Sequence, residues 1–303
     1  MNKELIFTVK YATEDDYPYI RKMIEYSSKN QEGEVGYPRC LSAEELFSEI
    51  EMYENRIEES ICILYCHDTP VALGGFIYEP EDEAAYVMGP ICEKKFYNKE
   101  NLKAMIEQML ASKQNLFKKL TVAVSRRNTL LDETYQELGW IYKETQREMG
   151  FDIKDVNIPS VQYQIHEISD KENKNIEPVF QLLDEVFHWN GTKYSIDDLL
   201  DEGFKLGYVC DEAGHVAGAV NWAYLENVDF SRLEYVAVRE ESRGKGIGEA
   251  MISHVLKDSI QNGMKQVYLS TNIENDNALN LYRKLGFYDT VSSNIYMKNL
   301  VVF

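Results

Sequence analysis

The sequence predicts an α/β protein of the α+β-leaning kind, built from two tandem domains that each hold a mixed, mostly antiparallel sheet flanked by helices. Two observations lead to this prediction: a repeated segment, and the same order of strand-like and helix-like segments in both halves of the chain. A chain of 303 residues is long enough for two domains with separate cores. Its content of 44% hydrophobic and 27% charged residues is that of an ordinary globular protein.

The repeat is clearest when "RNTLLDETYQELGW" (127–140) is set beside "ENDNALNLYRKLGF" (274–287). The matched pairs, all at one separation, are Asn128 and Asn275, Leu131 and Ala278, Tyr135 and Tyr282, Gly139 and Gly286, and Trp140 and Phe287. Upstream, "AMIEQML" resembles "AMISHVL" in the same order. Several shared features in one order indicate two homologous domains. The polar, proline-containing stretch 154–162 is typical of a linker, so we expect domains at 1–155 and 162–303.

Each half shows the same succession of elements. Apolar strand-like segments come first, helices with apolar residues at helical spacing follow, and β-rich runs with turn residues come next. A strand then leads into a long helix, another strand, a short helix and a final strand, which together give a mixed sheet. The expected segments, in the first and then the second half, are an opening strand (5–12; 161–168), a helix (17–29; 176–187), a β-rich run (60–80; 204–226) and a later strand (118–124; 265–271).

The net charge of −19 is spread over both halves of the chain. Such an acidic surface repels nucleic acids and anionic membranes, so we expect neither as a partner. It would attract a cationic substrate; the alternative is that it only keeps the protein soluble. The opening "MNKELIFTVK" has too short an apolar run for a signal peptide, and no later segment is long enough to span a bilayer. We expect a cytoplasmic protein, with no indication of an oligomer.

The five cysteines are scattered along the chain without a Cys-x-x-Cys pair. The stretch "CILYCH" (62–67) could suggest a metal site, but it lies in a strand-like run and lacks a second group of ligands. We therefore expect no metal and interpret the cysteines as buried free thiols, which agrees with a reducing compartment.

The stretch "RGKGIG" (243–248) places a glycine at every second position between an apolar strand and a helix. Glycine lets a backbone turn sharply and lets a ligand approach closely. A helix start presents unpaired N–H groups and positive partial charge, which suit an anion. The phosphate loop G-x-x-x-x-G-K-[ST] is absent, and the dinucleotide pattern G-x-G-x-x-G fails at Glu249 and Met251. What remains is R-G-x-G-x-G between a strand and a helix.

In this form the segment from 232 to 288 resembles the core of the GNAT superfamily of acyl-CoA-dependent N-acetyltransferases. The Arg/Gln-x-x-Gly-x-Gly/Ala signature of that family is met by Arg243, Gly246 and Gly248. Its later N-x-x-A-x-x-x-Y-x-x-x-G-F segment is met by residues 275–287. The resemblance spans roughly residues 163 to 297, and the loop is a weak signal alone but a strong one in this order.

The resemblance implies acetyl-CoA as co-substrate. The residues expected to contact it are Val236, Ala237, Val238, Arg243, Gly244, Lys245, Gly246, Ile247, Gly248, Asn275, Ala278 and Tyr282. The loop would hold the pyrophosphate through backbone N–H groups, and 236–238 would pair with the pantetheine arm. The alternative for Lys245 is a solvated side chain, and that for Asn275 is a helix N-cap.

Acetyl transfer to an amine requires loss of an amine proton, polarisation of the thioester and protonation of the leaving thiolate. Tyr282 matches the family position whose hydroxyl lies near the sulfur, which predicts a general acid; the alternative is a core tyrosine. Glu234 is the candidate base, because a period of two would place it on one face with Val236 and Val238. Its alternative is a cross-strand salt bridge.

An acceptor pocket is expected from residues on the preceding strand and after the first helix of the second half. Its candidates are Asn221, Trp222, Tyr224, Glu185, His188 and Trp189. For His188, a structural role at the end of the helix is the favoured interpretation.

The first half departs from the family pattern where the glycine loop should be. Its segment "CEKKFYNKEN" (92–101) has no glycine, and Phe96 and Tyr97 would crowd a pyrophosphate. Asn128 and Tyr135 nevertheless remain. We expect a degenerate GNAT-like domain without cofactor, in which 27–40 acts as a lid or binding loop, or a purely structural scaffold.

The sequence thus predicts an N-acetyltransferase with one working site, in the second domain. The acceptor would be a primary amine of a small molecule or peptide, with a cationic one favoured by the acidic surface. The alternative is a protein that binds acyl-CoA without turnover, as a sensor or interaction module.

Overall fold

The computed structural model describes residues 6–30, 33–38, 41–78, 83–113, 116–154, 158, 162–169, 172–187, 199–200, 203–225 and 227–300. The chain divides into two compact units. Unit 1 comprises Met1–Arg147 and Val291–Phe303, and unit 2 comprises Glu148–Thr290. Within the described residues, no helix combines the length and the apolar character needed to cross a membrane.

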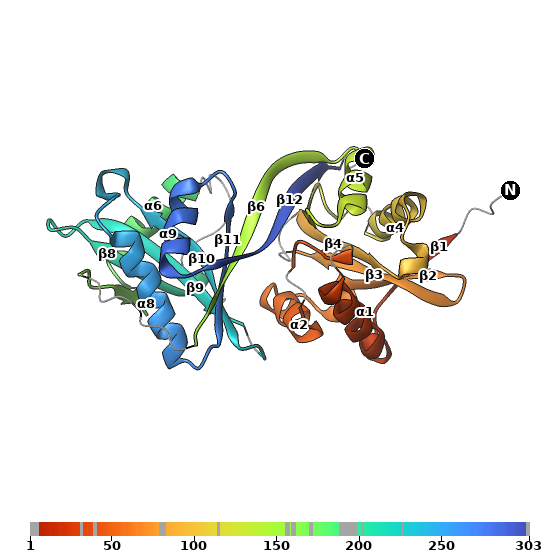
Figure 1. Cartoon of the computed structure of the whole chain (residues 1–303), viewed down its shortest axis with the longest axis horizontal. Helices are drawn as coiled ribbons and strands as arrows, with labels where there is room; N and C mark the ends of the chain where they lie inside the picture. The colour runs from red at the N-terminus through yellow and green to blue at the C-terminus, as the bar shows by residue number, and fades with distance from the viewer. Residues whose placement is uncertain are drawn as a thin grey trace. The chain divides into compact units, whose positions relative to one another are not determined.

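Unit 1 is a mixed sheet with helices on both faces (Figure 1). Strands β1 to β5 and β12 follow each other in the sheet, and β6 lies beyond β12. Strands β4 and β5 pair in parallel, and the pairs β1–β2, β2–β3, β3–β4 and β5–β12 are antiparallel. Its elements are β1 (Phe7–Tyr11), η1 (Glu14–Asp16), α1 (Tyr17–Lys29), α2 (Ala43–Met52), α3 (Ile57–Ser60), β2 (Ile61–Cys66), β3 (Thr69–Ile77), β4 (Ala84–Cys92), η3 (Lys94–Phe96), α4 (Lys99–Ser112), β5 (Lys119–Ser125), α5 (Thr129–Glu137) and most of β6 (Ile141–Asp152).

Unit 2 repeats this plan, with sheet order β7-β8-β9-β10-β11 followed by β6 and β12. Strands β10 and β11 are parallel, and the pairs β7–β8, β8–β9 and β9–β10 are antiparallel. The mixed, mostly antiparallel sheet flanked by helices is therefore confirmed. The elements are β7 (His166–Ile168), α6 (Ile176–Phe187), β8 (Lys205–Cys210), β9 (Val216–Tyr224), β10 (Phe230–Val238), η4 (Glu240–Ser242), α8 (Ile247–Gln261), β11 (Gln266–Asn272), α9 (Asp276–Leu285) and β12 (Tyr288–Asn299).

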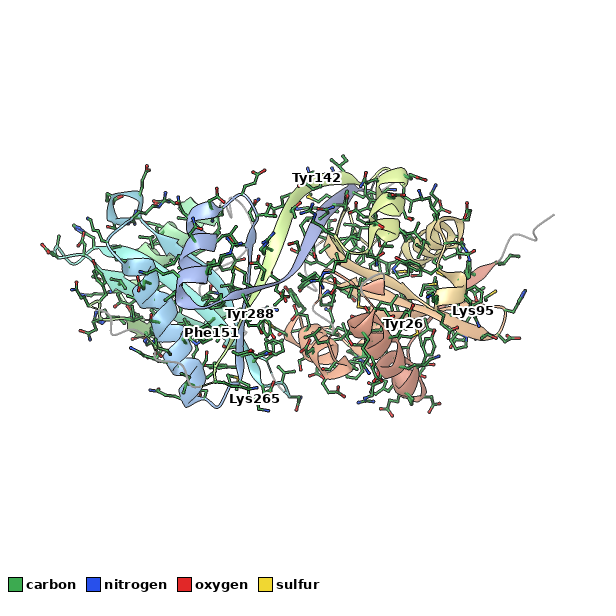
Figure 2. The ribbon with its side chains drawn as sticks, viewed as in Figure 1. Tyr26, Lys95, Tyr142, Phe151, Lys265 and Tyr288 are labelled. Carbon is green, nitrogen blue, oxygen red and sulfur yellow. The ribbon has the colours of Figure 1, made fainter. Side chains whose placement is uncertain are left out.

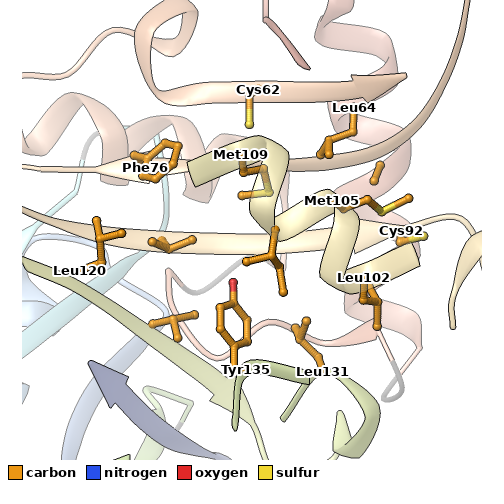
Figure 3. Packing of buried hydrophobic residues seen from close by; sticks show 14 of the residues in the cluster. Cys62, Leu64, Phe76, Cys92, Leu102, Met105, Met109, Leu120, Leu131 and Tyr135 are labelled. Carbon is orange, nitrogen blue, oxygen red and sulfur yellow. The ribbon is translucent and has the colours of Figure 1, made fainter. Parts of the chain in front are cut away.

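Helices cover the faces of each sheet and contact it through a stripe of apolar side chains. In unit 1, α4 directs Leu102, Met105, Ile106 and Met109 into the core, at the spacing of one helix face. Figure 3 shows Met109 near Cys62 and Phe76, and Met105 and Leu102 near Cys92. In unit 2, α8 crosses β8, β9 and β10 (Figure 1), and α6 packs against β9 and β10.

The boundaries between the units lie inside two strands rather than in a linker. Residues 148–152 of β6 belong to unit 2, and residues 291–299 of β12 belong to unit 1. In unit 2, Phe151 packs against Phe287 at 5.1 Å between ring centroids, and Tyr288 donates a hydrogen bond to Asp152 (3.1 Å). Figure 2 labels Phe151 and Tyr288. In unit 1, Ser293–Asn299 pairs with the whole of β5. The units therefore differ from the consecutive segments 1–155 and 162–303, because each contains a strand from the other half of the sequence.

Candidate active site

The parallel pair β10–β11 opens partway along its length. The two strands pair from Phe230 to Leu233, whereas β10 continues to Val238 and β11 to Asn272. The N–H groups of Tyr235 and Arg239 both bond toward β9, at 2.9 and 3.0 Å. Because backbone groups alternate between the two edges of a strand, Val236 and Val238 direct theirs to the open edge. Ala237 directs its backbone to β9 instead.

The loop "RGKGIG" follows this open edge and leads into α8. Gly244 and Gly246 have left-handed φ values of 74° and 87°, and a Cβ on either would meet nothing within 4 Å. Gly246 is the N-cap of α8 and gives no side-chain cap. Within the described part of the chain, the N–H groups of residues 244–249 make no hydrogen bond. A row of unpaired N–H groups at the start of a long helix is a binding surface for an anion.

The charges around the loop also suit an anion. Arg243 donates through Nε to the Val238 carbonyl (3.2 Å), so its guanidinium lies next to the open edge. Lys245 makes no ion pair among the described residues. The one acidic side chain in the first turn of α8, Glu249, is paired with Lys284 at 2.6 Å. The pairing offsets its repulsion of an anion at this helix end.

Tyr282 lies on α9 in the same buried cluster that Val236 and Val238 pack against. Its hydroxyl has no hydrogen-bond partner among the described residues. Burial raises the pKa of Tyr282 to about 12, so the phenol keeps its proton at neutral pH and remains a donor. Its ring packs against Phe287, with 5.7 Å between centroids. The neutral phenol is therefore able to donate a hydrogen bond to a ligand.

Asn275 is the N-cap of α9. Its Oδ1 accepts from the Ala278 N–H at 3.2 Å, which is the capping role that the sequence left open. Its Nδ2 has no partner within the described residues and is still able to donate to a ligand.

Glu234 lies where β10 changes register. The pairing with β9 shifts between Leu233 and Tyr235, so the period of two is broken at Glu234. Val236 and Val238 pack on the α8 side of the sheet, and Tyr235 packs on the α6 side, with its ring 4.7 Å from Phe187. The expected shared face of Glu234 with Val236 and Val238 is therefore not supported by this register. Its carboxylate forms an ion pair with Arg232 of the same strand.

The acceptor candidates on β9 point to opposite faces of the sheet. Trp222 and Tyr224 donate to the Asp258 carboxylate on α8. Asn221 is fully buried; its Oδ1 accepts from Tyr235 and its Nδ2 has no partner in the described chain. A buried unpaired amide donor is costly unless a ligand or water satisfies it. Asn221 is thus separated from Tyr224.

The remaining candidates lie after the first helix of unit 2. Glu185 pairs with Arg239 at 3.1 Å and its side chain is 61% exposed. His188 and Trp189 lie outside the described residues. Among the described residues, no group of three His, Cys, Asp or Glu side chains could hold a metal ion.

Two features of unit 2 have no marker in the sequence. Asp258 accepts from Trp222 (2.8 Å), Lys205 (2.9 Å) and Tyr224. Although burial alone would raise it, the hydrogen bonds of Tyr224, Lys205 and Trp222 hold the pKa of Asp258 below its usual value. Tyr163, ahead of β7, donates to the carbonyl of Lys245 at 3.0 Å. Neither contact follows from local periodicity, because the partners are far apart in sequence.

In unit 1 the N–H groups of Phe96, Tyr97, Asn98 and Asn101, which lie in the corresponding segment, have partners within the protein. The helix after β4 is capped by Asn98, whose side chain accepts from the Asn101 N–H at 3.0 Å. Phe96 packs edge-on against Phe7, and Tyr97 donates to Asn128. Phe96 and Tyr97 therefore pack against unit 1's own residues, and the helix start is closed by a side chain.

The open edge of β5 in unit 1 is covered by the chain itself. β4 and β5 pair only as far as Val87 and Val122. Beyond this point Val35 bridges Val124, and Gly36 donates to the Ala123 carbonyl at 3.2 Å. Asn128 donates through Nδ2 to Glu34 O at 3.1 Å. The described part of the segment 27–40 thus bonds to this sheet; residues 31–32 and 39–40 lie outside the described residues.

Part of unit 2 matches a known protein family in sequence. Residues 176–287 match the sequence model of the Acetyltransferase (GNAT) family. An acetyltransferase of Pectobacterium atrosepticum is 29% identical over 113 residues, which cover 37% of this chain and 78% of the relative.

Solved structures share the fold over nearly the whole chain. A GCN5-related N-acetyltransferase from Sphaerobacter thermophilus superimposes with a TM-score of 0.73 at 16% identity, covering 97% of this chain and 95% of the other. A tandem GNAT protein from the clavulanic acid biosynthesis pathway has a TM-score of 0.65 at 12% identity, covering 98% of both chains. At these identities the likeness concerns the fold, and it includes the tandem arrangement.

Proposed function

We propose that the protein transfers an acetyl group from acetyl-CoA to a primary amine, at one site in unit 2, because residues 176–287 of that unit match the GNAT family of acetyltransferases. The observation that carries the proposal is the row of unpaired N–H groups at residues 244–249, beside the open edge of β10. In unit 1 the matching helix start is capped, and the edge of β5, the counterpart of β11, is covered by residues 35 and 36. We therefore assign no cofactor to unit 1.

The residues of unit 2 suit the parts of coenzyme A. Residues 244–249 and the Arg243 and Lys245 side chains would hold the pyrophosphate. The backbone groups of Val236 and Val238 would pair with the amides of the pantetheine arm, and Asn275 Nδ2 would donate to the same molecule. The open space at Gly244 and Gly246 is what close approach of a phosphate requires.

In the reaction the acceptor nitrogen bonds to the thioester carbonyl carbon, the carbon–sulfur bond breaks, and the amine loses a proton. Tyr282 is proposed to give its proton to the departing thiolate, since its hydroxyl is neutral and unpaired. Glu234 is proposed to take the amine proton, directly or through a water molecule. Its ion pair with Arg232 is the competing structural role.

The acceptor is proposed to be a small-molecule or peptide amine, with a cationic one favoured by the net charge of −19. The buried free thiols of Cys62, Cys66 and Cys92 agree with a reducing compartment such as the cytoplasm. The alternative function is binding of acyl-CoA without turnover. The hydroxyl of Tyr282, which has no partner in the part of the chain that the structure describes, favours turnover, because it is able to protonate a leaving thiolate.

Calorimetric titration of acetyl-CoA into the wild type and two aspartate variants tests the proposal. Asp tolerates a left-handed backbone, so Gly246→Asp mainly places a negative charge in the loop. Gly263→Asp is the matched control, because Gly263 is also left-handed (φ 74°) with open space around it but lies beyond the C-terminal end of α8. We expect one site per chain, lost in Gly246→Asp and kept in Gly263→Asp.

The other outcomes are equally informative. Two sites per chain would contradict the assignment of unit 1. No binding by the wild type would reject the transferase and the acyl-CoA sensor together. Binding without thiol release across a panel of amines would favour the sensor.

A further inference from the structure

Tyr163, which is not part of the family signature, contacts the loop formed by residues 243–248. Tyr163 precedes β7, and its hydroxyl donates to the carbonyl oxygen of Lys245 at 3.0 Å. Its ring packs against the buried cluster that includes Ile247 and Met251 of α8. The contact therefore joins the opening segment of unit 2 to the peptide immediately before the N-cap of α8.

The segment that carries Tyr163 is held in place along its α8-facing side. Ile165 fills the space that a side chain at position 207 would need, with its Cγ2 3.0 Å from the Cβ position of Gly207. Glu167 bonds to His254 of α8 at 2.9 Å. The Tyr163 ring packs against the same buried cluster as Ile165, so both side chains lie on the α8 side of the segment.

The hydrogen bond fixes one peptide plane of the loop. In a planar trans peptide, the carbonyl of one residue and the N–H of the next point in opposite directions. When Tyr163 holds the Lys245 carbonyl, the Gly246 N–H is directed away from Tyr163. Gly246 has no Cβ and a left-handed φ, so without this bond the plane would rotate at little steric cost.

We infer that Tyr163 is a positioning residue for the pyrophosphate of the acyl donor, because it orients the Gly246 N–H before the ligand binds. This inference rests on the proposed function and specifies which part of the donor Tyr163 serves. Unit 1 provides a comparison: its opening strand contacts the loop before α4 through the rings of Phe7 and Phe96, 6.4 Å apart, without a hydroxyl. The hydroxyl contact thus occurs in unit 2, where the N–H groups of residues 244–249 have no partner among the described residues.

The test is Tyr163→Phe, which keeps the ring and removes only the hydroxyl. Loss of one hydrogen bond that organises the loop should raise the calorimetric Kd for coenzyme A and the KM for acetyl-CoA by about threefold to tenfold, with kcat unchanged. Acetyl-pantetheine lacks the pyrophosphate, so its kcat/KM should be the same in Tyr163→Phe and wild type. Tyr288→Phe is the control, since its hydroxyl donates to Asp152 of β6.

Unchanged affinity for coenzyme A in Tyr163→Phe would overturn the inference and leave the proposed function standing. Equal losses with acetyl-CoA and acetyl-pantetheine would also overturn it, since the hydroxyl would then act on the whole unit. A wild type that binds no coenzyme A would reject the proposed function, and the inference with it.

Discussion

The hydroxyl of Tyr135 donates a hydrogen bond to the carbonyl oxygen of Gly89 at 2.7 Å inside unit 1. Figure 3 shows Tyr135 reaching from α5 into the core, where it is fully buried. Tyr282, its counterpart in unit 2, keeps its hydroxyl free among the described residues. A tyrosine thus occupies the matching position in both units, but its hydroxyl is hydrogen-bonded only in unit 1 among the described residues. In unit 1 it stabilises the sheet, and in unit 2 it remains available to a reacting group.

This difference predicts that replacing the tyrosine by phenylalanine affects catalysis in unit 2 and stability in unit 1. Tyr282→Phe should lower kcat by about 10²-fold or more, the usual contribution of a general acid, with little change in the Kd for acetyl-CoA. Tyr135→Phe should leave kcat unchanged but destabilise the protein by about 1–3 kcal/mol, because the Gly89 carbonyl loses its buried partner. Steady-state kinetics and denaturant unfolding separate the two. Loss of kcat in both variants to the same extent would contradict the division of roles.

The ion pair of Glu234 with Arg232 makes the base assignment testable. If the carboxylate removes the amine proton, Glu234→Gln should lower kcat/KM by about 10²-fold at neutral pH. Arg232→Met breaks the same ion pair but leaves the carboxylate, so it should retain most of the activity. Equal losses of kcat/KM in the two variants would mean that only the ion pair matters.

The network around Asp258 predicts a pH-dependent stability. The pKa of Asp258 in the folded protein lies below its usual 3.8. Its stabilisation is therefore present above that usual value and is lost as the pH falls through the folded pKa. Asp258→Asn should be less stable than wild type at pH 7, and the difference in unfolding free energy should shrink below about pH 4. A constant difference from pH 7 to pH 3 would show that the charge of Asp258 does not stabilise the fold.

The sequence allowed the general plan to be predicted, because turns, apolar periodicity and the repeat are local signals. The division of β6 and β12 between the two units could not be predicted, because the sequence pattern of β6 is the same whichever unit its last residues join. The register shift at Glu234 also has no local marker in the sequence. The alternation of side chains was therefore extended through it, which placed Glu234 on the same face as Val236 and Val238. The N–H row at 244–249 followed from glycine spacing, whereas the contact of Tyr163 with Lys245 depends on tertiary structure alone.

The last residues of β6 belong to unit 2, although most of that strand belongs to unit 1. Phe151 lies in the first half of the sequence but is 2% exposed in the core of unit 2, against Phe287. Phe151→Ala should destabilise unit 2 by about 3–5 kcal/mol, the cost of a large cavity. Hydrogen exchange followed by mass spectrometry should then accelerate in α8 and β11 and remain unchanged in α4 and β5. Ile141→Ala is the control on the same strand, because Ile141 is 59% exposed. Faster exchange confined to unit 1 in Phe151→Ala would show that residues 148–152 are not part of unit 2.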